Sequence, residues 1–197
     1  GMTDGTVTAS VSAAAASDGA GNANTASTSI DNSVTYDTTP PTASAITTAN
    51  KTGGTQGKAG DTVTMTYNEA MAATSILSGW NGSSTNVVVR ITDGNNTNGL
   101  NDVLTVWDAS NGTQVALGSV DLASKAYVNG DVSFNNSTMS LSSGTITITL
   151  GTVSDGTKVG SDTGNNKVKW TPSNAATDLA GNAASTAFKQ SGNVEQF

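Results

Sequence analysis

The sequence predicts an all-β protein folded as an antiparallel β-sandwich. Apolar and polar residues alternate with a period of two in many short segments, and turn residues separate these segments at intervals of about ten residues. Only 12% of the residues are charged and 5% are aromatic. We therefore expect a thin core built from valine, isoleucine and leucine. A parallel solenoid, the main competing class, needs a short strict repeat that this chain lacks.

Two strands are predicted in the N-terminal segment. Residues 6–11 alternate with Val7 and Val11 on one face, and residues 26–36 continue with the same period. A two-stranded hairpin by itself is marginally stable in water. We therefore expect residues 3–36 not to fold alone. Their exposed edge should pair either with the complete unit of the same chain or with the same segment of a second chain, and the stiff joint at Pro40-Pro41 favours the second arrangement.

Pro40 and Pro41 mark a joint between this segment and the rest of the chain. Proline lacks an N–H donor and fixes φ, so the pair is expected to begin an edge strand and to stiffen the joint. Two domains are predicted. Residues 1–37 are expected to hold the closing strands of a preceding repeat and its linker. Residues 38–197 are expected to form a complete repeat.

The complete repeat is expected to hold about nine strands between Ala43 and Ala187, and its one helical hint is the short run after Glu69. The six side chains expected in the core are Val63, Met65, Val89, Ile146, Ile148 and Val168. The strand patterns cover residues 43–49, 62–67, 86–92, 103–107, 115–117, 120–122, 132–134, 139–141, 146–150 and 168–170.

Asn111-Gly112 is typical of a two-residue hairpin turn between two of these strands. A standard immunoglobulin-type sandwich has about 100 residues. The complete repeat is longer, so we expect residues 93–131 to add an extra hairpin to a seven-stranded sandwich.

One nine-residue segment occurs twice, 160 positions apart. Residues 15–23 and 175–183 agree at seven of nine positions, and each contains the pattern Asp-x-Ala-Gly-Asn. Between the copies lies Asp-Thr-Thr-Pro-Pro-Thr, residues 37–42. The combination resembles the bacterial immunoglobulin-like repeats of large secreted and surface-attached proteins. Residues 67–71, Tyr-Asn-Glu-Ala-Met, resemble in part a signature of one subfamily of these repeats.

This resemblance implies an immunoglobulin-like β-sandwich and a structural function. The expected protein is a stalk or spacer repeat of an adhesin-like protein, located outside the cell or on the bacterial surface, whose partners are neighbouring repeats. The alternative is a carbohydrate- or partner-binding module of a surface or phage-decoration protein. For that alternative Trp80, in a loop of Gly, Asn and Ser, is the candidate ligand-binding residue.

Composition excludes several other classes of function. The net charge of −7 repels nucleic acid and anionic membrane surfaces. No segment approaches the roughly 20 apolar residues of a membrane helix, so no membrane insertion is expected. No charged-then-apolar leader precedes the first strand, and we expect the chain to be an excerpt whose export and anchoring signals lie outside it.

Catalysis is not expected. The chain has no histidine and no cysteine, which excludes Ser-His-Asp and Cys-His mechanisms. A pair of carboxylates could serve a glycosidase, and Glu69, Asp93 or Asp102 could be proposed for it. Any sequence with 15 acidic residues contains such pairs, so they do not indicate an enzyme.

Calcium is the one cofactor that the loops suggest, because it binds carboxylate, amide and carbonyl oxygens. The resemblance implies a junction site, and the candidate ligands are Asp18, Asn22, Asp37, Asp178 and Asn182. The alternative is that each aspartate caps its corner by accepting backbone N–H groups while Gly-Asn supplies a positive-φ turn. The run from Asp93 to Gly99 resembles an EF-hand loop superficially, but its spacing favours a plain turn.

Overall fold

The computed structural model describes residues 3–51, 53–94, 100–162 and 166–192. Contacts divide the chain into two units, Gly1–Thr39 and Pro40–Phe197. We call the first unit the ribbon and the second the body.

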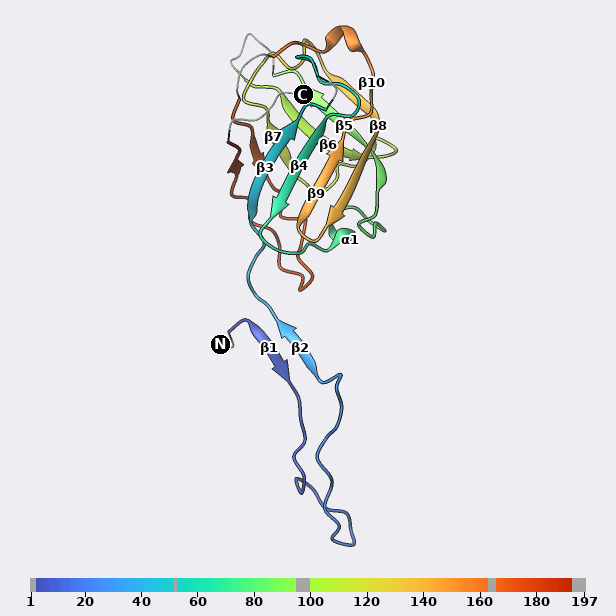
Figure 1. The fold of residues 1–197 in the computed structure, drawn as a ribbon, viewed down its shortest axis with the longest axis vertical. Coiled ribbons are helices and arrows are strands. Elements are labelled where there is room, and N and C mark those ends of the chain that lie inside the picture. The colour runs from blue at the N-terminus through green and yellow to red at the C-terminus, as the bar shows by residue number, and fades with distance from the viewer. Residues whose placement is uncertain (1–2, 52, 95–99, 163–165, 193–197) are drawn as a thin grey trace. The chain divides into compact units, whose positions relative to one another are not determined.

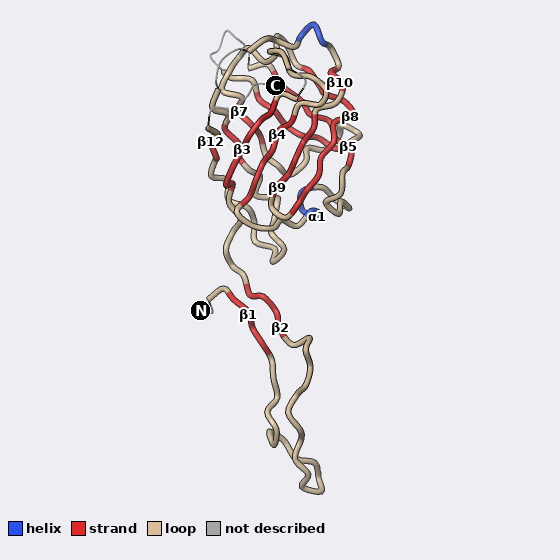
Figure 2. Tube along the Cα trace, viewed as in Figure 1, coloured by secondary structure: helices blue, strands red, loops and turns tan. Residues whose placement is uncertain are grey.

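Within the described residues, ten strands of the body form one antiparallel sheet (Figures 1 and 2). The order across this sheet is β12-β11-β7-β6-β5-β8-β9-β4-β3, and β10 pairs with β8 outside this path. The strands are β3 (Ala43–Ala49), β4 (Thr62–Tyr67), β5 (Thr85–Thr92), β6 (Val103–Asp108), β7 (Ser119–Asp121), β8 (Val132–Ser142), β9 (Thr145–Thr149), β10 (Thr152–Val153), β11 (Lys169–Thr171) and β12 (Lys189–Gln190).

The sheet curls until its two ends meet. β3 and β12 are the outermost strands of the path, yet they contact each other, and β3 also contacts β11. Near this contact Ser185 N donates to Pro41 O at 2.9 Å. The result is a nearly closed, barrel-like sheet, and the prediction of an antiparallel all-β protein is confirmed. The immunoglobulin-like sandwich is not confirmed, since the ten strands belong to one continuous sheet.

The core lies inside this curled sheet and follows the alternation in the sequence. All six side chains expected in the core are at most 1% exposed. In β4 the residues Val63, Met65 and Tyr67 are buried, whereas the threonines between them are partly exposed. Burying one side chain of this size stabilises the fold by about 1.5–3 kcal/mol. The core prediction is therefore confirmed.

Helical structure in the body is short. The turn expected after Glu69 is present as α1 (Ala73–Ile76), and η1 (Gly156–Lys158) is a single 3-10 turn capped by Asp155. Figure 2 shows both as brief interruptions of a β structure. Among the described residues, no helix has the length and apolar character needed to cross a bilayer.

Several local features differ from the sequence prediction. Residues 115–117, expected as a strand, form none. The turn at Asn111 spans four residues instead of two, because Asp108 N donates to Thr113 O at 2.8 Å. Residues 132–134 and 139–141 belong to one strand, β8, and not to two. Asn136 adopts a φ of 55° within it, and asparagine tolerates that conformation better than most residues. The strand therefore bends without ending.

The ribbon is a long two-stranded hairpin. β1 (Gly5–Thr8) pairs antiparallel with β2 (Ser33–Tyr36), and hydrogen bonds such as Ser27 N to Val11 O extend the pairing toward the corner at residues 18–22. None of the ribbon's described residues is buried, and Ile30 is 98% exposed. Backbone and side-chain hydrogen bonds hold this unit together without a buried core.

A glycine at the tip of the β8–β9 hairpin generates the first testable prediction. A Cβ on Gly144 would lie 2.0 Å from the carbonyl oxygen of Glu69, so Gly144→Ala must displace backbone. We expect it to lower the free energy of unfolding by about 1–3 kcal/mol, measured by urea denaturation. Gly156→Ala is the control, since its Cβ would meet only Val153 Cγ1 at 3.8 Å. Equal stability of the two variants would contradict this packing.

Candidate functional site

The corner at residues 178–182 of the body is built around one carboxylate. Asp178 Oδ1 accepts Asn182 N, and Oδ2 accepts Asn182 Nδ2, each at 2.9 Å. Asp178 N donates to Asn182 O at 3.1 Å, and Gly181 adopts a φ of 93°. The pattern Asp-x-x-Gly-Asn folds in this way because a short acidic side chain reaches the turn's donors and glycine permits the positive φ.

The ribbon repeats this corner bond for bond. Asp18 Oδ1 and Oδ2 accept the backbone and side-chain nitrogens of Asn22, each at 2.9 Å, and Gly21 has a φ of 89°. The correspondence continues beyond the carboxylate. Asn24 N donates to Ala16 O at 2.9 Å, as Ala184 N donates to Ala176 O at 2.8 Å in the body.

Among the described residues of its own unit, the body's corner packs against other elements, whereas the ribbon's corner has no buried residue in its unit. Asp178 forms an isolated β-bridge with Met71, and Ala72 N donates to Thr177 O at 2.9 Å. Ser75 Oγ accepts Thr177 N at 2.9 Å. Ala176 is fully buried there, whereas the equivalent Ala16 in the ribbon is exposed. The same local structure therefore exists once as part of a core and once without one.

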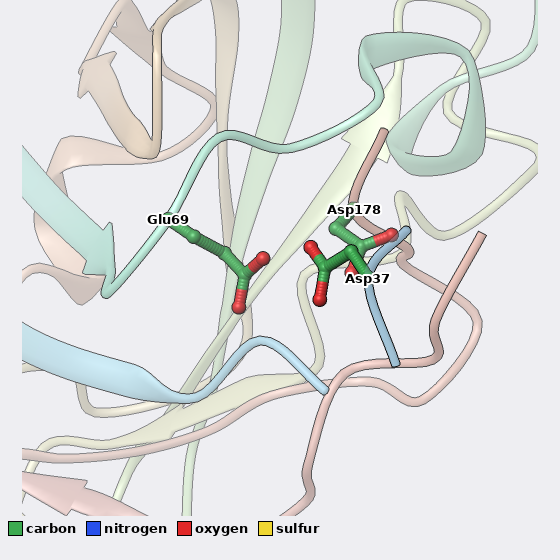
Figure 3. Close-up of side chains that lie close together, drawn as sticks. All are labelled: Asp37, Glu69 and Asp178. Atoms are coloured by element: carbon green, nitrogen blue, oxygen red, sulfur yellow. The ribbon is translucent and has the colours of Figure 1, made fainter. Parts of the chain in front are cut away.

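This packing brings Asp178 close to Glu69 (Figure 3). The chain after β4 crosses the tip of the β8–β9 hairpin, where Tyr67 N donates to Gly144 O at 2.8 Å, and then pairs with the corner. Carboxylate oxygens of Glu69 and Asp178 lie within 4.8 Å of each other. Two carboxylates at this separation are suitable ligands for a hard cation such as calcium. Asp37, also labelled in Figure 3, belongs to the ribbon unit.

The environment of each corner lowers the pKa of its aspartate. Burial by itself raises the pKa of Asp178, but the hydrogen bonds from Asn182, Ala180 and Gly181 together outweigh it, and the pKa falls below 3.8. The Asn22 side chain, followed by backbone N–H groups, lowers the pKa of the exposed Asp18. Both aspartates are charged at neutral pH, which suits a cap and a cation ligand alike.

The five residues predicted as calcium ligands fall into three places. Asp178 and Asn182 share one corner, Asp18 and Asn22 share the other, and Asp37 lies just before the joint. In both corners the asparagine amide donates to the aspartate, so the capping interpretation describes the contacts that are present, and calcium binding stays a prediction. Sequence reasoning did not pair Glu69 with Asp178, although it singled out both of their loops separately.

The tryptophans are mainly packing residues. Trp80, the predicted ligand-binding residue, is 6% exposed, and its Nε1 donates to Ser83 O at 2.6 Å beside a polar hollow of about 300 Å³. Trp170 is fully buried, donates to Leu117 O at 2.7 Å and meets Tyr67 edge to face at 4.8 Å. Only Trp107 lies on the outer side of the sheet.

Asp102, one of the acids considered for catalysis, ties loops together. It is fully buried, and its two oxygens accept Gly94 N at 3.0 Å and Val128 N at 3.1 Å. Burial raises the pKa of Asp102 more than these hydrogen bonds lower it. Residues 95–99 of the EF-hand-like run lie outside the described residues.

Comparison of the chain with protein-family models, curated proteins and solved structures found no match. The fold and the site geometry therefore carry the functional argument.

The corner supports a prediction on acid stability. A carboxylate whose pKa is lowered in the folded state stabilises it above the ordinary pKa, and this contribution is lost as the pH falls through the folded-state pKa. In Asp178→Asn, the new side-chain amide either places its nitrogen against Asn182 Nδ2 or leaves one of the two N–H groups of Asn182 without an acceptor. We expect it to cost about 1–3 kcal/mol at neutral pH and to flatten the loss of stability below about pH 4.

Thermal melts between pH 2 and pH 7 measure both effects. Asp18→Asn is the matched control, because it alters the same hydrogen bonds in the ribbon and should leave the body's melting unchanged. If Asp18→Asn and Asp178→Asn shifted the body's transition equally, the docked corner would not be the cause.

Proposed function

We propose that this chain is a structural spacer repeat of a bacterial cell-surface or secreted, adhesin-like protein. The observation that carries the proposal is the corner that is built twice with the same hydrogen bonds, docked in the body and undocked in the ribbon. A protein made of repeats needs the same closing structure at the end of every unit.

The sequence correspondence covers the corner itself, residues 15–23 and 175–183. In the body, residues 166–192 include β11 and β12 and contribute Trp170, Ala176 and Ala184 to the core. In the ribbon, β1 and β2 flank the corner as β11 and β12 flank it in the body. The ribbon is then the closing hairpin of a neighbouring repeat, and its natural partners are strands of that repeat.

The body in this proposal is a variant of the immunoglobulin-like sandwich found in bacterial repeats. An extra hairpin within residues 93–131, which contain β6 and β7, enlarges it. What supports this assignment is antiparallel all-β structure, a valine- and isoleucine-rich core, and the partial signature at residues 67–71 where the chain leaves β4.

A spacer requires no chemistry of its own, and we propose that the chain is not an enzyme. Its location in this proposal is extracellular. The low charge density, with 12% of residues charged, and the absence of cysteine from the sequence agree with a surface repeat.

The ribbon gives the proposal its test. An isolated ribbon exposes two strand edges and apolar side chains such as Val34, and exposed edges recruit strands. We expect the full chain to form a dimer through residues 3–36 and a chain beginning at Thr38 to be a monomer, as measured by light scattering. Val34→Lys in the full chain should weaken the dimer, whereas Lys51→Gln in the body should not. If the full chain and the chain beginning at Thr38 were both monomers, or both dimers, the ribbon would not be a closing hairpin that recruits other strands.

Calcium at the corner is proposed as an addition to the spacer function. A ligand that binds only the folded state raises the melting temperature by mass action, with about 2.7 kcal/mol gained at a concentration 100 times Kd. We expect millimolar calcium to stabilise the body and a chelator to reverse this.

Glu69→Gln should reduce the calcium-dependent shift, because its carboxylate lies beside that of Asp178. Asp37→Asn tests separately the ligand that the sequence predicts at the joint. Asp31→Asn removes an equal charge from the ribbon and serves as the control. Identical melts with calcium and with chelator would remove calcium from the proposal and leave the spacer function standing.

A further inference from the structure

A polar row crosses the outer side of the sheet. Arg90 in the middle of β5 lies opposite Thr105 of β6 and Ser133 of β8 in the strand register. Its neighbours Val89 and Ile91 are buried, so by alternation Arg90 faces away from the core. Ser154, just beyond β10, extends the row, because Ser133 N donates to Ser154 Oγ at 3.0 Å.

Arg90 is held in one orientation. Its guanidinium carbon lies 3.6 Å from the centre of a ring of Trp107, and the Trp107 ring is itself fixed by a 2.9 Å bond from Nε1 to Thr105 Oγ1. Arg90 Nε donates to Asn111 Oδ1 and Nη2 to Asn111 O, both at 2.7 Å. Asn111 is itself held by the four-residue turn, since Asn111 N donates to Asp108 O at 2.8 Å. Stacking and hydrogen bonding together make a preorganised cation.

No carboxylate among the described residues of the body neutralises the charge of Arg90. Arg90 is the single arginine of the chain, in a sequence with 15 acidic residues. Its two hydrogen bonds within the described residues both go to Asn111, and no described carboxylate pairs with it. Arginine has five N–H donors, so the two bonds leave three without a described partner.

These donors border a polar hollow of about 310 Å³, whose lining includes Arg90, Asn111, Asp131, Ser133 and Ser154. A guanidinium binds a carboxylate through paired hydrogen bonds. Hydroxyl and amide groups, and the acceptor oxygens of Asp131, suit neighbouring hydroxyl groups of the same ligand. Asp131 and the net charge of −7 disfavour a dense polyanion such as nucleic acid.

We propose that this hollow binds a saccharide that carries a carboxylate, that is, a uronic acid residue of an acidic glycan. The guanidinium of Arg90 takes the carboxylate, and Asp131, Ser133 and Ser154 take ring hydroxyls. The site lies on β5, β8 and the Asn111 turn and does not involve Trp80. It goes beyond the spacer function, which needs no ligand, and would let the spacer itself adhere to an acidic surface polysaccharide.

The test is an NMR titration of the full chain with trigalacturonate. We expect the indole N–H signal of Trp107 and the Nε–H signal of Arg90 to shift with a saturable dependence on concentration. The methyl-esterified trisaccharide is the matched ligand control, since it keeps the hydroxyls and removes the charge. It should bind at least tenfold more weakly to the unaltered protein.

Variants separate recognition from folding. Arg90→Gln should weaken trigalacturonate binding at least tenfold, and Arg90→Lys, which keeps the charge but loses the paired donors, should weaken it less. Lys51→Gln removes the same charge at a distant exposed position and should leave binding unchanged. The proposal is overturned if the unaltered protein shows no saturable shift, if the ester binds as well as the acid, or if Arg90→Gln and Lys51→Gln bind alike. None of these outcomes bears on the ribbon's association, so the spacer function is tested independently.

Discussion

The body depends on the way its last hairpin closes the sheet. Trp170 of β11 is fully buried, donates to Leu117 O and packs edge to face on Tyr67 of β4, so one side chain links three separate segments. β11 pairs with β7 on one side, and both β11 and β12 contact β3. Without this hairpin both β7 and β3 would present open edges, which are unstable and recruit other chains. Closure comes with one unfavourable feature, because the buried Tyr67 hydroxyl has no hydrogen-bond partner among the described residues.

The two corners separate local from tertiary stabilisation. The carboxylates of Asp18 and Asp178 accept the same hydrogen bonds from the following asparagine, so the turn itself requires nothing beyond its own residues. Burial differs completely, since Ala176 is fully buried and Ala16 is exposed. Hydrogen bonds to a turn contribute little net stability in water, whereas burial of apolar surface drives folding. For this reason the ribbon is a formed but unsupported structure.

In the described part of the chain, several carboxylates hold loops in place through hydrogen bonds. Buried or half-buried carboxylates such as Asp61, Asp102 and Asp178 accept backbone N–H groups and hold loops against the sheet. Arg90 stands apart, because an aromatic ring and an amide hold it on a sheet face of Thr and Ser. A rigid cation that pairs with no carboxylate among the body's described residues is suited to an external anion.

The sequence by itself determined the local structure. Alternation identified β3, β4, β5, β6 and β9 nearly to the residue, and all six predicted core side chains are buried. The repeated Asp-x-x-Gly-Asn pattern identified both corners. These features depend on neighbours within a few positions, so strand period and turn chemistry are sufficient to predict them.

The tertiary structure alone decided how these pieces combine. The order of strands, the meeting of β3 with β12, the burial of Trp80 and the approach of Glu69 to Asp178 all depend on contacts between distant segments. The same holds for Arg90, which reads in the sequence as one charged residue in a strand and becomes a site only where Trp107 and Asn111 meet it. The alternation of apolar and polar residues shows which residues of a strand share a face. It does not show which strand pairs with it, because many pairings bury the same face equally well.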